Sequence, residues 1–148
     1  MTQPAKLQFT IYQGATFSER WQRLLCAYAV VERNGKLVRK DDGRPVPPAD
    51  LVPDDYTGCT ARMQLRRSVD SLYVLDEFDT ADGSLTLTSD GWVQIDKSDA
   101  DTAAMKYGND DKRGAWQSAI GQLEVTRPNG TKERQFVIAF VLDPEGTK

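Results

Sequence analysis

Residues 58–68 read GCTARMQLRRS, and this stretch decides the fold class. Apolar and polar side chains alternate through it without interruption. The apolar set is Cys59, Ala61, Met63 and Leu65, and the polar set is Thr60, Arg62, Gln64 and Arg66. Because successive side chains of a strand point to opposite faces of a sheet, this period of two predicts a half-buried strand with a basic outer face.

Other segments show the same period and predict further strands. They are LQFTIY (7–12), GSLTLT (83–88) and WVQID (92–96). The dipeptides Asn34-Gly35, Asp90-Gly91, Asn129-Gly130, Asp82-Gly83 and Asp42-Gly43 lie between such segments. These dipeptides tolerate the positive φ of tight hairpin turns. RQFVIAFVLD (134–143) is apolar on both faces, which predicts a strand that is central to the fold or covered by another element.

One short helix, about residues 99–106, interrupts the strands. Ser98 is a suitable N-cap, Asp99 and Asp101 favour the first turn, and Gly108 ends the segment. We therefore expect one domain, 1–148, built as an all-β antiparallel sandwich of seven to eight strands, with a small barrel as the alternative. A flexible N-terminal arm (1–6) and a long proline-rich loop (39–57) complete the prediction.

Composition limits the functions that the chain could perform. Its 148 residues include no histidine, which excludes Ser-His-Asp and Cys-His catalysis and histidine-ligated zinc. The net charge of −3 gives no reason to expect nucleic acid or an anionic membrane as a partner. No apolar run approaches the 18 or so residues of a membrane span, and the N-terminus does not resemble a signal peptide, so we expect a cytoplasmic location after synthesis.

The carboxylates do not form a recognisable site. Asp79 and Asp82 with Gly83 lack the spacing of a calcium loop, and Asn109, Asp110 and Asp111 offer at most a weak one. Glycoside hydrolysis needs two acids that flank a cleft. Asp54, Asp55, Asp76 and Glu77 could be nominated, but no feature of the sequence singles out a pair. We predict no catalytic residue, no metal site and no cofactor.

Partner binding is the remaining possibility. The candidate contact residues are Arg62, Arg66, Arg67, Trp92, Tyr107, Asp110 and Asp111. Arginine and aromatic residues are enriched at protein interfaces, although an arginine row is more often the solvated face of a strand and most aromatic residues fill a core. The segments 1–6, 39–57 and 107–115 are the expected contact elements.

The order of these features resembles a group of small structural proteins of tailed bacteriophages and prophages. The motifs that carry the resemblance are FTIYQGATF (9–17), YTGCTARMQLRRS (56–68), DGSLTLTSDGWVQIDKSDADTAAM (82–105) and GQLEVTRPNGTKERQFVIAFVLDPE (121–145). The chain is also similar to the N-terminal domains of some phage baseplate and receptor-binding assemblies, which have immunoglobulin-like folds.

This resemblance implies an immunoglobulin-like sandwich that acts without catalysis as an adaptor in the tail, baseplate or fibre-attachment region. The implied partners are other virion proteins, in several copies per particle, and the implied location is the virion, with the host cytoplasm during assembly. A host-surface glycan-binding module using Trp92 and Tyr107, a head decoration protein and a carboxylate-dependent hydrolase are the alternatives.

Overall fold

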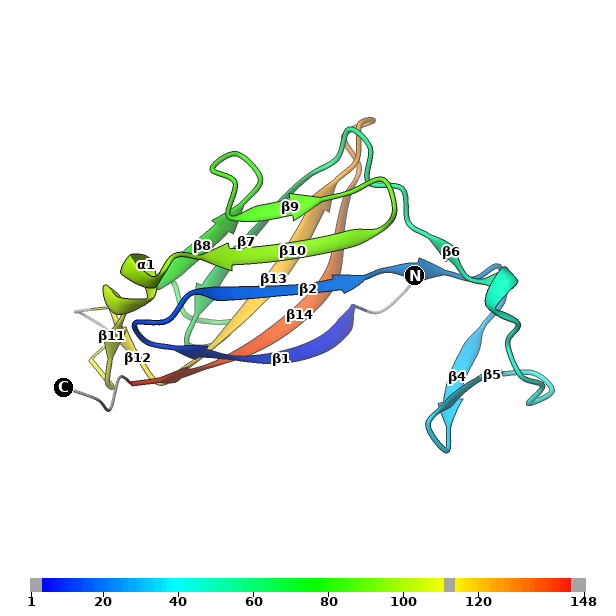
Figure 1. Cartoon of the computed structure of the whole chain (residues 1–148), viewed down its shortest axis with the longest axis horizontal. Coiled ribbons are helices and arrows are strands. Elements are labelled where there is room, and N and C mark those ends of the chain that lie inside the picture. Colours follow the sequence, from blue (N-terminus) through cyan, green and yellow to red (C-terminus); the bar gives the residue numbers. More distant parts are fainter. Residues whose placement is uncertain (1–3, 111–113, 145–148) are drawn as a thin grey trace.

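The computed structural model describes residues 4–110 and 114–144 and shows two β-sheets packed face to face (Figure 1). The larger sheet has the order β1 (Ala5–Tyr12), β14 (Lys132–Asp143), β13 (Ser118–Thr126), β7 (Thr60–Arg66) and β8 (Asp76–Asp79). The smaller sheet has the order β2 (Phe17–Gln22), β10 (Trp92–Lys97) and β9 (Leu85–Leu87). The all-β prediction is confirmed, while the immunoglobulin-like assignment stays a prediction.

The core lies between the two sheets and follows the predicted alternation. Ala61, Met63 and Leu65 of β7 are buried, whereas Arg62 on the opposite face is exposed. Aromatic rings fill the space between the layers, and the rings of Phe78 and Phe140 stack with their centroids 6.0 Å apart. Most of the buried apolar residues form one hydrophobic cluster to which both sheets contribute.

The strand predicted from RQFVIAFVLD is central to the larger sheet. β14 pairs with β13 on one side and with β1 on the other. The pairing with β1 is parallel, from Ala5 opposite Phe136 to Tyr12 opposite Asp143, whereas the other strand pairs of the two main sheets are antiparallel as predicted. No tight turn joins these first and last strands, and therefore no local signal fixes their relative direction.

The helix is shorter than expected. α1 spans Asp99–Ala103, and the Ser98 hydroxyl caps it by accepting a hydrogen bond from the Asp101 amide at 3.1 Å. Beyond it the chain turns into β11 (Lys106–Tyr107), which pairs with β12 (Ala115–Trp116). Buried Thr102 attaches α1 to the sandwich, because its hydroxyl donates to the Ala15 carbonyl in the turn after β1.

Residues 24–53 leave the sandwich as a projecting arm (Figure 1). Its base is the short pair β3 (Leu24–Leu25) and β6 (Val52–Pro53), and its end is the hairpin of β4 (Val30–Arg33) and β5 (Lys36–Arg39). The hairpin turns at Asn34-Gly35 as predicted, with φ of 54° and 78°. A 3₁₀ turn, η1 (Pro48–Asp50), lies on the return path.

Two expected segments therefore differ from the structure. The stretch 39–57 is not simply a connecting loop, because Val52 and Pro53 pair with Leu25 and Leu24 to close the arm. In the predicted flexible segment 1–6, Ala5 and Lys6 already belong to β1, while residues 1–3 lie outside the described part.

Candidate interaction surfaces

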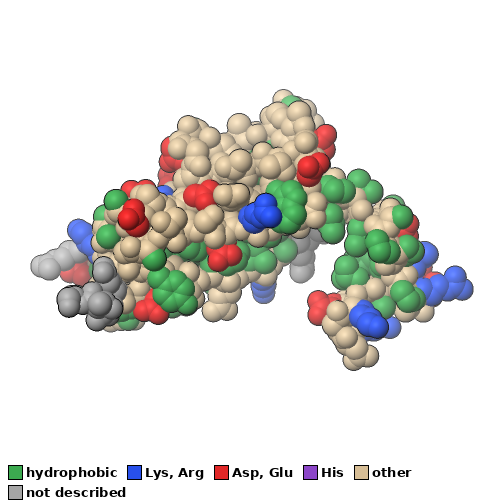
Figure 2. Space-filling view, in the orientation of Figure 1, with side chains coloured by type: hydrophobic (Ala, Val, Ile, Leu, Met, Phe, Trp, Pro, Cys, Tyr) green, Lys and Arg blue, Asp and Glu red, His purple; other side chains and the backbone are tan. Residues whose placement is uncertain are grey.

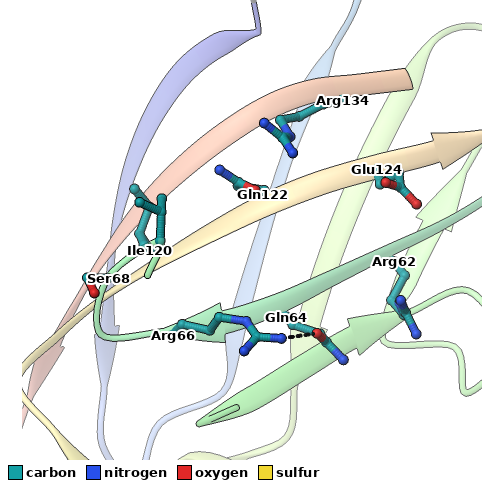
Figure 3. A pocket seen from close by; sticks show the side chains of 9 residues that line it. Arg62, Gln64, Arg66, Ser68, Ile120, Gln122, Glu124 and Arg134 are labelled. Carbon is teal, nitrogen blue, oxygen red and sulfur yellow. Dashed lines mark hydrogen bonds between the residues drawn. The ribbon is translucent and has the colours of Figure 1, made fainter. Parts of the chain in front are cut away.

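The predicted basic face of β7 forms part of a shallow polar pocket on the outer face of the larger sheet (Figure 3). The pocket measures about 190 Å³ and is lined by Arg62, Gln64 and Arg66 of β7 together with residues of β13 and β14. Arg134 of β14 and Glu124 of β13 face each other across its rim. The pocket brings two of the predicted contact residues, Arg62 and Arg66, onto one surface.

The charges of this pocket alternate along one cross-strand row. Arg62 lies in register with Glu124 on one side and Asp79 on the other. Arg66 donates hydrogen bonds to the Gln64 side chain at 2.7 Å and to the Ser71 carbonyl at 2.9 Å. Opposite charges on neighbouring strands stabilise a sheet. Much of the positive charge of this row is therefore balanced by the acidic side chains next to it. The Arg66 guanidinium is held in place by hydrogen bonds within the chain.

Arg67 lies apart from that face. Its guanidinium donates hydrogen bonds to the carbonyl oxygens of Gly108, at 3.3 Å, and Ala115. Both residues belong to the segment 107–115, which the sequence analysis nominated as a contact element. Arg67 therefore attaches that segment to the end of β7 through hydrogen bonds to backbone carbonyls.

The two aromatic candidates lie at opposite ends of the sandwich. Trp92 begins β10, is half-buried, and has the guanidinium of Arg20 at 4.6 Å from its ring centroid. Tyr107 is exposed in β11, beyond the other end of β10 (Figure 1). The two rings are not brought together into one sugar-binding surface. Asp110 lies near Tyr107 in the chain, and its backbone carbonyl accepts a hydrogen bond from the Ala115 amide. Asp111 lies outside the described residues.

The carboxylates considered as calcium ligands close local turns. Asp79 accepts a hydrogen bond from the Ala81 amide, and Asp82 accepts one from the Ser84 amide. Within residues 4–110 and 114–144, no three Cys, Asp or Glu side chains are arranged to hold a metal ion.

An ion-pair network centred on the buried Asp54 lies where the arm joins the sandwich. Asp54 follows β6, and its carboxylate accepts hydrogen bonds from Arg23 at 2.6 Å and from both terminal nitrogens of Arg127, at 2.9 and 2.8 Å. Arg127 comes from the β13–β14 hairpin and also binds Glu133 at 2.9 Å. Arg23 precedes β3, so Asp54 ties both ends of the arm to each other and to the larger sheet. We call these four residues the clamp.

The clamp shifts the pKa of its carboxylates. Burial by itself raises the pKa of Asp54, but the hydrogen bonds and charges of Arg127 and Arg23 outweigh burial, so the pKa is lowered. The hydrogen bond from Arg127 also lowers the pKa of Glu133, against a smaller effect of burial. Asp54 was nominated above as a possible hydrolase acid. The structure makes it the ionised centre of a structural network.

An open groove of about 920 Å³ lies between the arm and the sandwich (Figure 2). Its walls combine arm residues such as Leu25, Val31 and Leu37 with Ala5 and Phe136 of the sandwich. Large apolar side chains of the arm remain exposed here and beside the groove. They are Leu24, Leu25, Leu37 and Val52.

Sequence reasoning missed this groove, because it expected the stretch 39–57 to be a connecting loop and did not predict that Val52 and Pro53 close an arm by pairing with Leu24 and Leu25. The signal that was present is the pair Leu24-Leu25, which lies between the end of β2 and the turn at Asn34 without the alternation of a sandwich strand.

Comparison with models of known protein families finds no match to this chain, and comparison with curated proteins finds none either. None of the helices that the structure describes is long and apolar enough to span a membrane.

Proposed function

We propose that this chain is a non-enzymatic adaptor that works through protein–protein contacts, with the arm and its groove as the main docking element. The observation that carries the proposal is a projecting arm whose base is fixed by ion pairs to the buried Asp54, while its apolar side chains stay exposed. Exposed apolar surface around a groove is typical of sites that bind other proteins.

The clamp explains how such an arm can bind. A segment that becomes ordered only on binding loses conformational entropy at that moment, which weakens affinity. Here Asp54 and Arg23 hold the base in one geometry, and the backbone amide of Arg23 also donates to the Gly91 carbonyl at 2.8 Å. The arm is therefore pre-organised, and a partner gains most of the apolar contact with Leu24, Leu25 and Leu37.

The sequence resemblance supports a setting for this adaptor. We place it in the tail, baseplate or fibre-attachment region of a tailed-phage particle, with other virion proteins as partners, after assembly in the host cytoplasm. Particles of that kind repeat one chain many times, so modest contacts add through multivalency. The immunoglobulin-like character of the sandwich belongs to the same proposal.

The proposal is tested by assembling particles with the wild-type chain or with the arm variant Leu24→Asp/Leu37→Asp. We expect peptide mass spectrometry to find the wild-type chain in purified tails and to find the arm variant depleted at least tenfold. Val141→Asp is the matched control, since Val141 is exposed to 39% against 43% for Leu24 but lies outside the arm. Absence of the wild-type chain from particles would refute the phage setting. Recovery with heads alone would favour a head decoration protein.

A further inference from the structure

The arm end of the molecule is basic as well as apolar. The stretch 30–44 contains five basic and three acidic residues, in a chain whose net charge is −3. The rest of the chain therefore has fourteen basic and nineteen acidic residues. Figure 2 shows hydrophobic side chains over the base of the arm and Lys and Arg side chains farther out. Lys40 and Arg23 line the groove itself.

The opposite end of the sandwich exposes a second apolar element, the loop 67–75 between β7 and β8. Leu72 has 94% of its surface exposed, and Val69 and Tyr73 are exposed as well. Arg66 binds the Ser71 carbonyl within this loop at 2.9 Å. The loop is thus attached at its centre while the neighbouring Leu72 side chain points into solvent.

This second end is acidic. Among the described residues of the segments 67–77 and 96–110, seven are acidic and three are basic. The segments belong to one surface, because Lys97 contacts Asp76 at 3.1 Å and Arg67 donates to the Gly108 carbonyl. Asp99 and Asp101, two of these seven, are exposed in the first turn of α1.

The two surfaces lie at opposite ends of the long axis (Figure 1). β7 connects them: Thr60, at its start, follows the segment that contains Asp54 of the clamp, and Arg66, at its end, leads into the loop 67–75. A strand of this length spans about 20 Å at about 3.3 Å per residue. The Leu72 side chain of one copy therefore cannot reach the arm groove of the same copy.

We infer that copies of this chain associate head to tail, with the loop 67–75 of one copy docked in the arm groove of the next. The occupant matches the groove in both respects that the structure shows. Leu72 and Val69 supply apolar side chains, and the acidic surroundings of the loop complement the basic arm. This inference rests on the proposed adaptor function and names a second copy of the chain as one of its partners.

Such a contact uses two different surfaces and is therefore heterologous. Contacts of this type close into rings when the rotation between copies allows it and otherwise give open filaments. Charge complementarity of exposed groups is screened by salt, so association should be stronger at low ionic strength. In a particle that holds many copies, the local concentration raises the occupancy of a weak contact.

The test is sedimentation velocity on the purified chain across a wide concentration range. The wild-type chain should self-associate at low salt and dissociate at high salt. The loop variant Leu72→Asp and the groove variant Leu25→Asp should each weaken self-association about tenfold or more, since each puts a charge where the proposed contact would bury a leucine. Lys40→Glu is a second groove variant that leaves the apolar residues in place and should act in the same direction.

The mixture of the two leucine variants is decisive. Leu72→Asp keeps an intact groove and Leu25→Asp keeps an intact loop, so an equimolar mixture should form a one-to-one heterodimer that grows no further. A mixture that stays monomeric, or a Leu72→Asp variant that associates like the wild type, would overturn the inference. So would a wild-type chain that is monomeric at every concentration and salt. If the wild-type chain is monomeric but still enters particles through its arm, the adaptor proposal stands and only the self-association falls.

Discussion

Replacing Asp54 with asparagine should destabilise the fold strongly. The substitution keeps the shape of the side chain and removes its charge, which leaves Arg23 and Arg127 without their shared carboxylate. The Asp54 side chain is only 5% exposed, whereas those of the two arginines are each 19% exposed. Removing one member of a buried ion pair costs about 3–5 kcal/mol. Because Arg127 keeps Glu133 and both arginines reach water, we expect about 3 kcal/mol, the lower end of that range.

Urea denaturation at neutral pH measures this loss. A chain of this size should have a slope of about 2 kcal/mol per molar urea, so the midpoint of Asp54→Asn should fall by about 1.5 M. Asp41→Asn is the matched control. The Asp41 side chain is 69% exposed and lies 3.5 Å from Arg39, and exposed pairs of this kind contribute at most about 1 kcal/mol.

The pH dependence gives an independent test of the same network. The pKa of Asp54 is lower in the folded chain than in the unfolded one, so its stabilisation is complete above the unfolded value of about 3.9. That stabilisation is lost as the pH falls through the lower, folded pKa. The difference in the free energy of unfolding between wild type and Asp54→Asn should therefore become smaller in acid. A variant within about 0.5 kcal/mol of wild type at pH 7, with a gap that does not change in acid, would refute a stabilising clamp.

Three further substitutions test other contacts of the fold by urea denaturation. Gly91→Ala should cost about 2 kcal/mol or more, because φ is +84° and an added Cβ meets a carbonyl oxygen of the arm base at 2.7 Å; Gly83→Ala, with φ of +82° and open space, should cost only about 1 kcal/mol. Gly121→Ala should cost about 1–3 kcal/mol, since the added Cβ lies 2.6 Å from the Met63 sulfur. Combining it with Met63→Ala should cost less than the sum of the two single losses, and strict additivity would contradict the steric reason. Ser98→Ala should remove the cap of α1 and cost about 1 kcal/mol.

The strands of the sandwich were predictable because their signals are local. Alternation in 58–68 gave the buried face of β7 correctly, and the turn at Asn34-Gly35 was found from two residues. The cap at Ser98 was equally local. Each of these features depends on residues within one or two turns of chain, and propensity and period describe such features well.

The clamp and the parallel β1–β14 pair were not predictable in the same way. Asp54 lies 31 residues from Arg23 and 73 from Arg127, and no period in the sequence connects them. As a result, Asp54 could be nominated only as one acid of a possible pair, with no partner identified. Large sequence separation also explains why the contacts of Arg67 were not predicted. Its position in the sequence placed it next to the outer face of β7, but its carbonyl partners lie 41 and 48 residues further on.

The clamp fixes the direction of the arm, while other residues of the arm are left to contact a partner. A purely apolar base would hold the arm without fixing its direction, because the hydrophobic effect is non-directional. The two parallel hydrogen bonds from Arg127 to Asp54 specify a plane and an angle as well as an attraction. The exposed leucines of the arm add little to the stability of the free chain and are available for a partner. Substitutions in the clamp should therefore change stability and docking together, whereas substitutions at Leu24 or Leu37 should change docking alone.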